Sequence, residues 1–160
     1  MSIYTKIGDR GTTSSGNALK EKDDILIECL GTLDELVSLL GITRTHITDI
    51  PVNNNILNIQ RKLFIIGAEL SQNNKQGIDP KDVKWLESII DNTMKDHVIE
   101  NFIVPGNNKE SSYLHMSRAL TRRLERRLAS LKRTNNFNIL ILEFINRLSD
   151  VFFAMAIDLE

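Results

Sequence analysis

Apolar residues recur every three or four positions along most of the chain, which is the period of one face of an α-helix. Five such stripes occur, separated by polar breaks. Asp79 and Pro80, just before the third stripe, are typical of an N-cap and of a first helical position. The first predicted helix begins at about residue 24 and ends at about 41 or 45. The second covers about 52–72, and the third begins at 80 and extends to 90 or beyond. The fourth covers about 109–131, and the fifth begins at about 138 and ends near the C-terminus.

Residues 1–23 differ from the rest of the chain. They contain three glycines, five hydroxyl residues between Thr5 and Ser15, and no helical period, so we expect an ordered loop or a short extended segment. No convincing strand pattern occurs in the chain. With short connections, this predicts an all-α fold with one domain over 1–160: an up-and-down five-helix bundle preceded by a glycine- and hydroxyl-rich loop.

The chain of 160 residues has a formal net charge of −1, but its positive charge is concentrated. Six of the ten arginines lie between Arg118 and Arg133, together with Lys132, and only Glu125 opposes them there. The overall charge gives no reason to expect nucleic acid as a partner. The basic window leaves a nucleic-acid-binding bundle open as a distant alternative.

Composition excludes several classes of protein. The longest apolar run, Val151–Ile157, is shorter than the roughly 20 residues of a membrane span. The first twenty residues contain no signal-peptide core, so we expect a cytoplasmic protein and no membrane partner. Cys29 is the single cysteine, and its apolar neighbours indicate a buried, inert thiol. His46, His97 and His115 lack the spacing of metal ligands, so we expect no metal site built from protein side chains.

The fourth predicted helix has the clearest chemical pattern. Polar residues spaced by three or four positions share one of its faces, opposite a leucine stripe. This face contains His115, Arg118, Arg122, Glu125 and Ala129. A solvated basic face is the ordinary interpretation of such a run. The use of arginine instead favours a phosphate or carboxylate ligand, because a guanidinium presents a planar fork of donors.

Polar residues in the first and fifth predicted helices are candidates to compensate these arginines. Asn146 and Asp150 interrupt a strongly apolar segment, so we expect them to be buried, with Asn146 or Asp150 facing the arginines. Asp34 and Glu35 are an acidic pair inside the apolar stripe of the first helix, and we expect Asp34 to pair with an arginine across the bundle. Such a pair is either purely structural or fixes the geometry of a site.

Residues 5–15 contain the components of a phosphate-binding nest. Gly8 and Gly11 allow backbone N–H groups to converge, hydroxyl side chains add donors, and Lys6 adds a positive charge. The segment is not a Walker A loop, because no Gly-Lys-Ser/Thr follows at the required spacing. This loop and the arginine-rich helix both suit a polyphosphate, and together they favour a nucleotide site.

Six blocks of sequence support a family resemblance, and together they span nearly the whole chain. They are Tyr4–Thr13, Gly31–Leu36, Phe102–Gly106, Leu114–Arg118, Thr121–Arg126 and Phe144–Asp150. In content and order they closely resemble the signature blocks of ATP:cob(I)alamin adenosyltransferases of the propanediol-utilisation (PduO) type.

The resemblance implies a five-helix bundle that forms a homotrimer with active sites between subunits. It implies transfer of the 5′-deoxyadenosyl group of ATP to the cobalt of cob(I)alamin, with release of triphosphate. Mg²⁺ is expected on the ATP phosphates, and a reductase is an expected partner because Co(II) must be reduced to Co(I). Cob(I)alamin is itself a strong nucleophile, so the protein's task is positioning and charge stabilisation.

The resemblance also implies roles for individual residues. Those implied to line the ATP phosphates are Thr5, Lys6, Gly8, Asp9, Gly11, Thr13 and Ser14, with Lys22 as a further contact. Those implied to complete the nucleotide site are Arg122, Arg123, Glu125, Arg126 and Asn146. The implied catalytic set is Arg122, Phe102, Asp34 and Arg118.

Three of these residues have more specific implied tasks. Arg118 and Asp34 are implied to form an ion pair between helices or between subunits. Phe102 is implied to lie under the corrin and to block the lower axial position of cobalt. His115 is implied to contact cobalamin.

The chain departs from the family pattern at Val37, Asn107 and Ile157, and it ends at Glu160 without the common C-terminal extension. These departures leave an alternative open. The alternative is a non-catalytic helical module that binds ATP or escorts cobalamin.

Overall fold

A computed structural model describes residues 4, 6–16, 18–72, 77–99 and 101–160, and its helices confirm the predicted five-helix bundle. The helices are α1 (Ile25–His46), α2 (Ile50–Gln72), α3 (Pro80–Met94), α4 (Lys109–Leu131) and α5 (Leu140–Asp158). The bounds of α4 agree with the prediction at both ends, and α1 takes the longer of its two predicted lengths. Within the described ranges, no helix combines the length and the apolar character needed to cross a membrane.

A side-chain cap explains where α1 begins. The carboxylate of Asp24 accepts a hydrogen bond from the backbone N–H of Leu26 at 2.8 Å and one from Nζ of Lys20 at 2.7 Å. The Lys20 ammonium, together with the Leu26 N–H, lowers the pKa of Asp24 below its ordinary value. The carboxylate therefore stays ionised, and the cap stays formed, at every pH above that lowered value.

A reciprocal cap explains where α3 begins. The backbone N–H of Asp82 donates to Oδ1 of Asp79 at 3.2 Å, and the N–H of Asp79 donates to Oδ2 of Asp82 at 3.1 Å. Pro80 occupies the first turn, where its missing N–H costs nothing. The predicted N-cap and first helical position of α3 are therefore confirmed.

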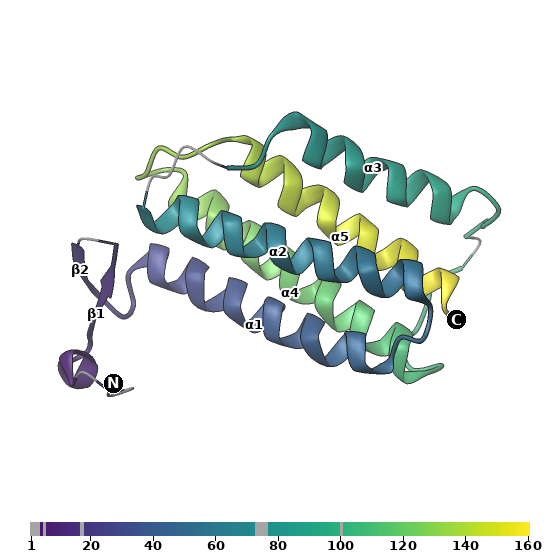
Figure 1. Cartoon of the computed structure of the whole chain (residues 1–160), viewed down its shortest axis with the longest axis horizontal. Helices are drawn as coiled ribbons and strands as arrows, with labels where there is room; N and C mark the ends of the chain where they lie inside the picture. The colour runs from purple at the N-terminus through teal and green to yellow at the C-terminus, as the bar shows by residue number, and fades with distance from the viewer. Residues whose placement is uncertain (1–3, 5, 17, 73–76, 100) are drawn as a thin grey trace.

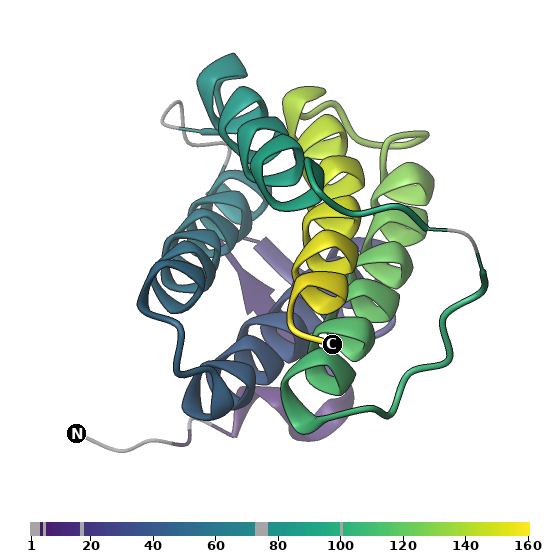
Figure 2. The ribbon, with the colours of Figure 1, turned by 90° about the vertical axis from the view of Figure 1, so that its right-hand side faces the viewer.

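The helices run alternately up and down along one long axis (Figure 1). α4 packs against both α1 and α5, α3 packs against α5, and α2 packs against α1. Viewed from one end, α5 lies near the centre of the bundle (Figure 2). The connection between α3 and α4 lies at the end of the bundle opposite the N-terminal segment (Figure 1).

The predicted apolar stripes meet in one core between the helices. One fully buried side chain from each helix in turn is Leu36, Ile59, Leu86, Leu124 and Phe152. Burying a side chain of this kind contributes about 1.5–3 kcal/mol relative to leaving it exposed. Hydrophobic burial therefore fixes which side of each helix faces inward.

The prediction that the chain contains no strand was wrong. β1 (Thr12–Ser15) and β2 (Ala18–Glu21) form an antiparallel hairpin, which a 3₁₀ turn over Ile7–Arg10 precedes. The sequence did contain a signal, since Gly16-Asn17 is a typical two-residue hairpin connection, and Gly16 has a φ of 58°. The strands are short and lack apolar alternation, so periodicity did not indicate them.

Replacing Asp79 with alanine should lower the free energy of unfolding by about 1 kcal/mol, because α3 loses its capping box. For a chain of this size, that corresponds to a fall in Tm of about 2–4 °C. Asp91→Ala is the matched control, since Asp91 is exposed on the same helix and makes no side-chain hydrogen bond within the described residues. Thermal unfolding followed by circular dichroism compares the two variants, and equal melting temperatures would contradict the cap.

Candidate functional site

Two arginines of α4 are held by carboxylates of α1. Arg123 pairs with Glu35, and Nη2 of Arg127 lies 2.6 Å from Oε2 of Glu28. Arg127 also donates a hydrogen bond to the hydroxyl of Thr32. Because these pairs are partly exposed, each contributes at most about 1 kcal/mol to stability. Their main effect is to neutralise the side of α4 that faces α1.

A second set of α4 arginines has no such partner. Arg118, Arg122 and Arg126 recur at every fourth position and therefore share one face of the helix. Arg122 and Arg126 are exposed, and none of the three side chains makes an ion pair or hydrogen bond within the described residues. Their positive charge is uncompensated within this part of the chain, and it can attract an anion.

The predicted pair between Asp34 and an arginine does not form within the described part of the chain. Glu28, Thr32 and Glu35 follow the helical period on the side of α1 that faces α4. Asp34 precedes Glu35 by one residue, so its side chain is turned by about 100° and is exposed. The prediction of a pair inside one chain was therefore wrong, whereas a pair between subunits stays a prediction.

The prediction that Asn146 and Asp150 are buried, with one of the two facing the arginines of α4, was also wrong. Both are exposed, because their spacing of four residues places them together on the outer side of α5. Nδ2 of Asn146 donates to Oε1 of Glu125 at 2.8 Å, and Asp150 pairs with Arg147 on its own helix at 3.4 Å. The structure therefore brings together two expected nucleotide-site residues, Asn146 and Glu125, without an arginine between them.

The N-terminal loop folds back on itself around Lys22. The backbone N–H of Lys22 donates to the carbonyl of Gly11 at 2.8 Å, and its Nζ lies 3.3 Å from the position that a Cβ on Gly8 would take. Lys6 has a φ of 62° and Gly11 a φ of 85°, both in the left-handed region. This conformation is uncommon for a lysine, and such strain clusters at functional sites.

The other expected phosphate contacts lie along the same segment. Asp9 is exposed in the 3₁₀ turn, and β1 contains Thr13, which is half-buried, and Ser14, which is exposed. Thr5 lies outside the described residues. The described loop thus presents several polar groups, at the end of the bundle where α1 begins (Figure 1).

A cleft of about 440 Å³ lies between the hairpin and the helix pair α1 and α4. Thr13 and Lys22 line it from the hairpin side, and Arg123 and Arg127 line it from α4. Gly31 of α1 lines it as well, and nothing lies within 4 Å of the position of a Cβ there. The cleft brings one part of the predicted loop together with the paired arginines, but Arg122 and Arg126 do not line it.

A second cleft, of about 590 Å³, lies beside the connection between α3 and α4. Phe102 and Pro105 of the connection line it, with His115 and Arg118 of α4 and Phe153 of α5. The guanidinium carbon of Arg118 lies 6.0 Å from the centroid of the Phe153 ring. Phe102 and His115, the two residues expected on the corrinoid side of the site, therefore line one cleft together with Arg118.

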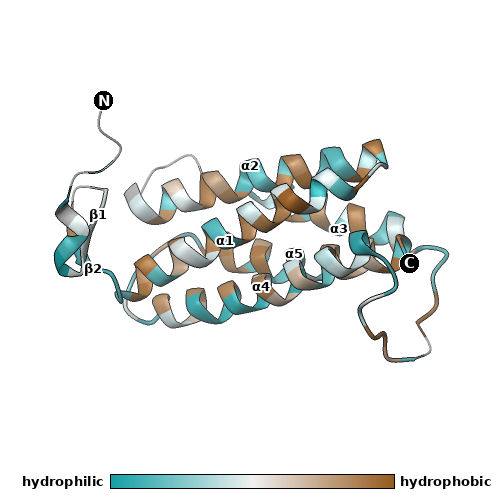
Figure 3. Ribbon diagram, turned by 90° about the horizontal axis from the view of Figure 1, so that it is seen from below, coloured by the Kyte–Doolittle hydropathy of each residue, from teal (hydrophilic) through white to brown (hydrophobic). Residues whose placement is uncertain are grey.

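The connection exposes apolar side chains at this cleft. Phe102 is fully exposed, and Val98 and Val104 are 84% and 80% exposed. Figure 3 shows the connection, with apolar stretches in brown, standing away from the helices. Several exposed apolar side chains within one short segment are consistent with a binding surface.

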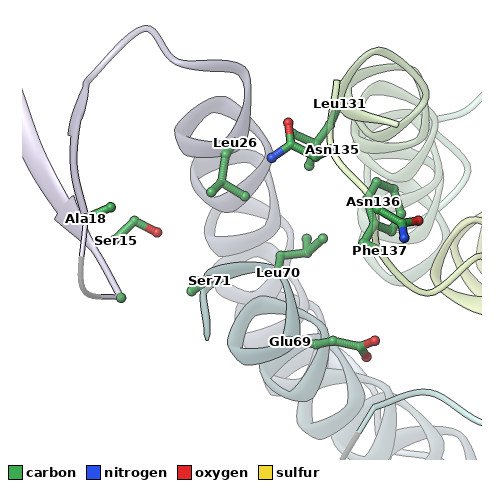
Figure 4. A pocket seen from close by; sticks show the side chains of 11 residues that line it. Ser15, Ala18, Leu26, Glu69, Leu70, Ser71, Leu131, Asn135, Asn136 and Phe137 are labelled. Atoms are coloured by element: carbon green, nitrogen blue, oxygen red, sulfur yellow. The ribbon is translucent and has the colours of Figure 1, made fainter. Parts of the chain in front are cut away.

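A third cavity, of about 730 Å³, contains none of the predicted site residues (Figure 4). It lies at the hairpin end of the bundle, between the hairpin turn, the ends of α2 and α4, and the segment before α5. Ser15 and Glu69 each have a buried side-chain oxygen without a hydrogen-bond partner among the described residues. We assign no function to this cavity.

Cys29 is fully buried in α1, which confirms the prediction of a buried thiol. Burial raises the pKa of the thiol to about 11, because water no longer stabilises the thiolate. A thiol with this pKa is a poor nucleophile at neutral pH. In the described ranges, no group of three or more His, Cys, Asp or Glu side chains could hold a metal ion.

Sequence reasoning missed several residues of these clefts. The spacing of Glu28, Thr32 and Glu35 was an available signal, because intervals of four and three place them on one helical face. Phe153 gave no signal of its own, since it lies within the long apolar run of α5 and differs from its neighbours only in the direction in which it points.

The fold and the clefts define a helical bundle that can hold an anion on the free arginine face and a large, partly apolar ligand beside Phe102. Residues 3–159 match the family model described as cobalamin adenosyltransferase. The chain therefore belongs to the cobalamin adenosyltransferase family, and its activity is the transfer of the adenosyl group of ATP to a corrinoid. Of the two functions that the sequence left open, an adenosyltransferase and a non-catalytic helical module, the family match supports the adenosyltransferase.

Two curated relatives named corrinoid adenosyltransferase are similar to this chain over most of their length. The protein from Citrobacter freundii is 40% identical, over 96% of this chain and 92% of the relative. The protein from Bacillus subtilis is 35% identical, over 98% of this chain and 85% of the relative.

Solved structures of a PduO-type ATP:corrinoid adenosyltransferase from Lactobacillus reuteri have the same fold. A phenylalanine-to-histidine variant complexed with cobalamin and ATP aligns with a TM-score of 0.91 at 36% identity, over 97% of this chain and 89% of that chain. An arginine-to-lysine variant complexed with ATP aligns with the same TM-score of 0.91 and the same identity of 36%, over 96% of this chain and 91% of that chain.

Cys29 should resist modification by dithiobis(nitrobenzoate) at pH 8 in the native protein. Raising the thiol pKa from 9.0 to about 11 lowers the thiolate fraction at this pH about a hundredfold, and burial blocks access as well. The same protein unfolded in guanidinium chloride is the control, and it should react promptly. Equal rates in the two conditions would show that the thiol is accessible.

Proposed function

We propose that this chain binds ATP through its N-terminal loop and the free arginines of α4, and a corrinoid in the cleft beside Phe102. The observation that carries the proposal is that Arg122 and Arg126, on one face of α4, have no carboxylate partner within the described residues. The neighbouring Arg123 and Arg127 do have such partners. A triphosphate carries several negative charges, and guanidiniums bind phosphate oxygens through paired donors.

The reaction needs positioning and charge stabilisation. Cobalt(I) attacks the 5′-carbon of ATP, and a Co–C bond forms as the C5′–O bond breaks. Triphosphate leaves with the electron pair of that bond, and cobalt becomes formally Co(III). The protein holds the 5′-carbon in line with cobalt and stabilises the charge that develops on the leaving group. Arg122 and the Mg²⁺ that enters with ATP suit the second task.

The loop is the proposed phosphate-binding segment. The left-handed Lys6 and Gly11 support this role, because alternating backbone conformations converge N–H groups on an anion. Lys22 adds an ammonium next to Gly8. The other proposed ATP contacts are Thr5, Asp9, Thr13, Ser14, Arg123, Glu125, Arg126 and Asn146.

Phe102 is the proposed lower axial neighbour of cobalt, and His115 is a proposed corrinoid contact. The exposed Phe102 ring supports this role, because it gains apolar burial when a corrin covers it. An apolar group in the axial position removes a ligand from cobalt and so eases the reduction of Co(II) to Co(I). A separate reductase is the proposed electron donor, and the proposed location is the cytoplasm.

The two halves of the proposed site lie at opposite ends of one chain. The loop lies at the end of α4 opposite the Phe102 connection (Figure 1), and the 23 residues of α4 extend about 35 Å at 1.5 Å per residue. The 5′-carbon and cobalt must approach within bonding distance, so a second copy of the chain has to supply the other half. This supports sites between subunits, and the homotrimer implied by the family resemblance is the proposed assembly. Asp34 and Arg118, which lack ion-pair partners within the described residues, are the proposed pair across that interface.

An anaerobic assay with chemically reduced cob(I)alamin and MgATP tests this function. The purified chain should convert the spectrum of cob(I)alamin to that of adenosylcobalamin and should release triphosphate. A reaction without ATP is the control. Binding of ATP without this conversion would overturn the proposed function.

Arg122→Ala should lower kcat about a hundredfold or more, because the departing triphosphate loses a preorganised positive group. The melting temperature should not change, since Arg122 is exposed and its side chain makes no hydrogen bond or ion pair within the described residues. Arg133→Ala, which removes an exposed arginine just beyond α4, is the matched control and should stay near wild type. Wild-type turnover by Arg122→Ala would remove Arg122 from the mechanism.

Phe102→Ala should leave the KM for ATP unchanged and should slow adenosylation about tenfold or more when the reaction starts from Co(II), because the apolar axial neighbour is lost. Phe64→Ala is the matched control, since Phe64 is also an exposed phenylalanine but lies on α2. Rates are compared with Co(II) and with prereduced Co(I). An unchanged rate from Co(II) would contradict the role of Phe102.

A further inference from the structure

The end of α5 is bonded to both ends of the connection that carries Phe102. At its start, Nε2 of His97 lies 3.1 Å from Oδ1 of Asp158. At its other end, Nδ2 of Asn108, the N-cap of α4, donates to the carbonyl of Leu159 at 2.6 Å. The connection is therefore anchored at two points on a single short segment.

The next residue of that segment makes a buried contact with α4. Nε2 of His115 lies 3.3 Å from Oε1 of Glu160, and the two side chains are only 5% and 14% exposed. An ionised carboxylate only accepts hydrogen bonds, so we assign the donor to Nε2–H of His115. Nδ1 of the same ring is buried without a partner among the described residues. Loss of the Glu160 carboxylate would leave both ring nitrogens unpaired there, which is costly for a buried ring.

The His115 ring is also part of the wall of the cleft beside Phe102. Its centroid lies 6.2 Å from that of Phe153 in an edge-on contact, and the guanidinium of Arg118 lies over the same Phe153 ring. Rotation of His115 would therefore disturb two other side chains that line the cleft. The contact with Glu160 prevents that rotation.

We propose that Glu160 and Asp158 are positioning residues for the corrinoid side of the site. Glu160 fixes the orientation of His115, and Asp158 fixes the start of the connection that carries Phe102. This inference rests on the proposed function, because it takes the cleft beside Phe102 as the corrinoid site. Within the described residues, neither carboxylate contacts a residue proposed to bind ATP, so we expect ATP binding to be independent of both.

Glu160→Ala tests the buried contact, and Glu160→Gln tests whether an acceptor at the same place restores it. Glu160→Ala should raise the KM for cob(I)alamin about tenfold, since a buried donor loses its partner, and should leave the KM for ATP unchanged. Glu160→Gln should recover most of the loss, because the amide oxygen can still accept from Nε2–H. Absorption titration with cob(II)alamin in the presence of ATP measures corrinoid affinity without turnover. The wild type should bind most tightly, Glu160→Gln slightly less tightly, and Glu160→Ala most weakly.

Two further variants complete the experiment. Asp158→Ala removes the exposed contact with His97, so it should fold normally and weaken cob(II)alamin binding less than Glu160→Ala does. Glu143→Ala is the matched control, because Glu143 is exposed on α5 and its side chain makes no hydrogen bond or ion pair within the described residues. This control should bind both substrates as the wild type does.

The outcomes are distinguishable. Wild-type corrinoid affinity in Glu160→Ala would overturn the inference. Equal rises in both KM values, accompanied by a lower melting temperature and without rescue by glutamine, would show a merely structural role and would overturn it as well. A wild-type enzyme without turnover would instead overturn the proposed function itself, on which the inference rests.

Discussion

The packing of α4 between α1 and α5 is the constraint on which the site depends. Leu124 and Leu128 are fully buried, so hydrophobic burial fixes the rotation of α4 about its own axis. That rotation turns Arg123 and Arg127 toward the glutamates of α1 and leaves Arg122 outside. Ion pairs at a partly exposed surface are weak, so leucine burial decides which arginines stay free for an anion.

The same packing separates the two chemical tasks in space. The hairpin and its glycine-rich turn lie where α1 begins, and the Phe102 connection lies where α4 begins (Figure 1). The bundle is rigid between these ends because its core is continuous along the helices. This separation supports the proposal that assembly of subunits brings nucleotide and corrinoid together, and the inference that the end of α5 positions the corrinoid side within each chain.

Much of the fold followed from the sequence, because amphipathic periodicity and caps are local properties. The bounds of α4 and the cap at Asp79 were predicted correctly for this reason. The hairpin was missed, because its pairing is stabilised between strands and leaves little apolar pattern within them. Asp34 and Asn146 were placed wrongly, because interruption of an apolar stripe does not tell which way an interrupting side chain points.

The sequence by itself determined that the chain is a helical bundle, that its positive charge gathers on one helix, and which family's blocks it contains. These are properties of composition, period and order, and they need no contact between distant residues. The tertiary structure alone decided that Glu35 and not Asp34 meets an arginine, and that Glu160 reaches His115. The reason is geometric: a one-residue shift turns a helical side chain by about 100°, and only packing fixes which direction faces a neighbour.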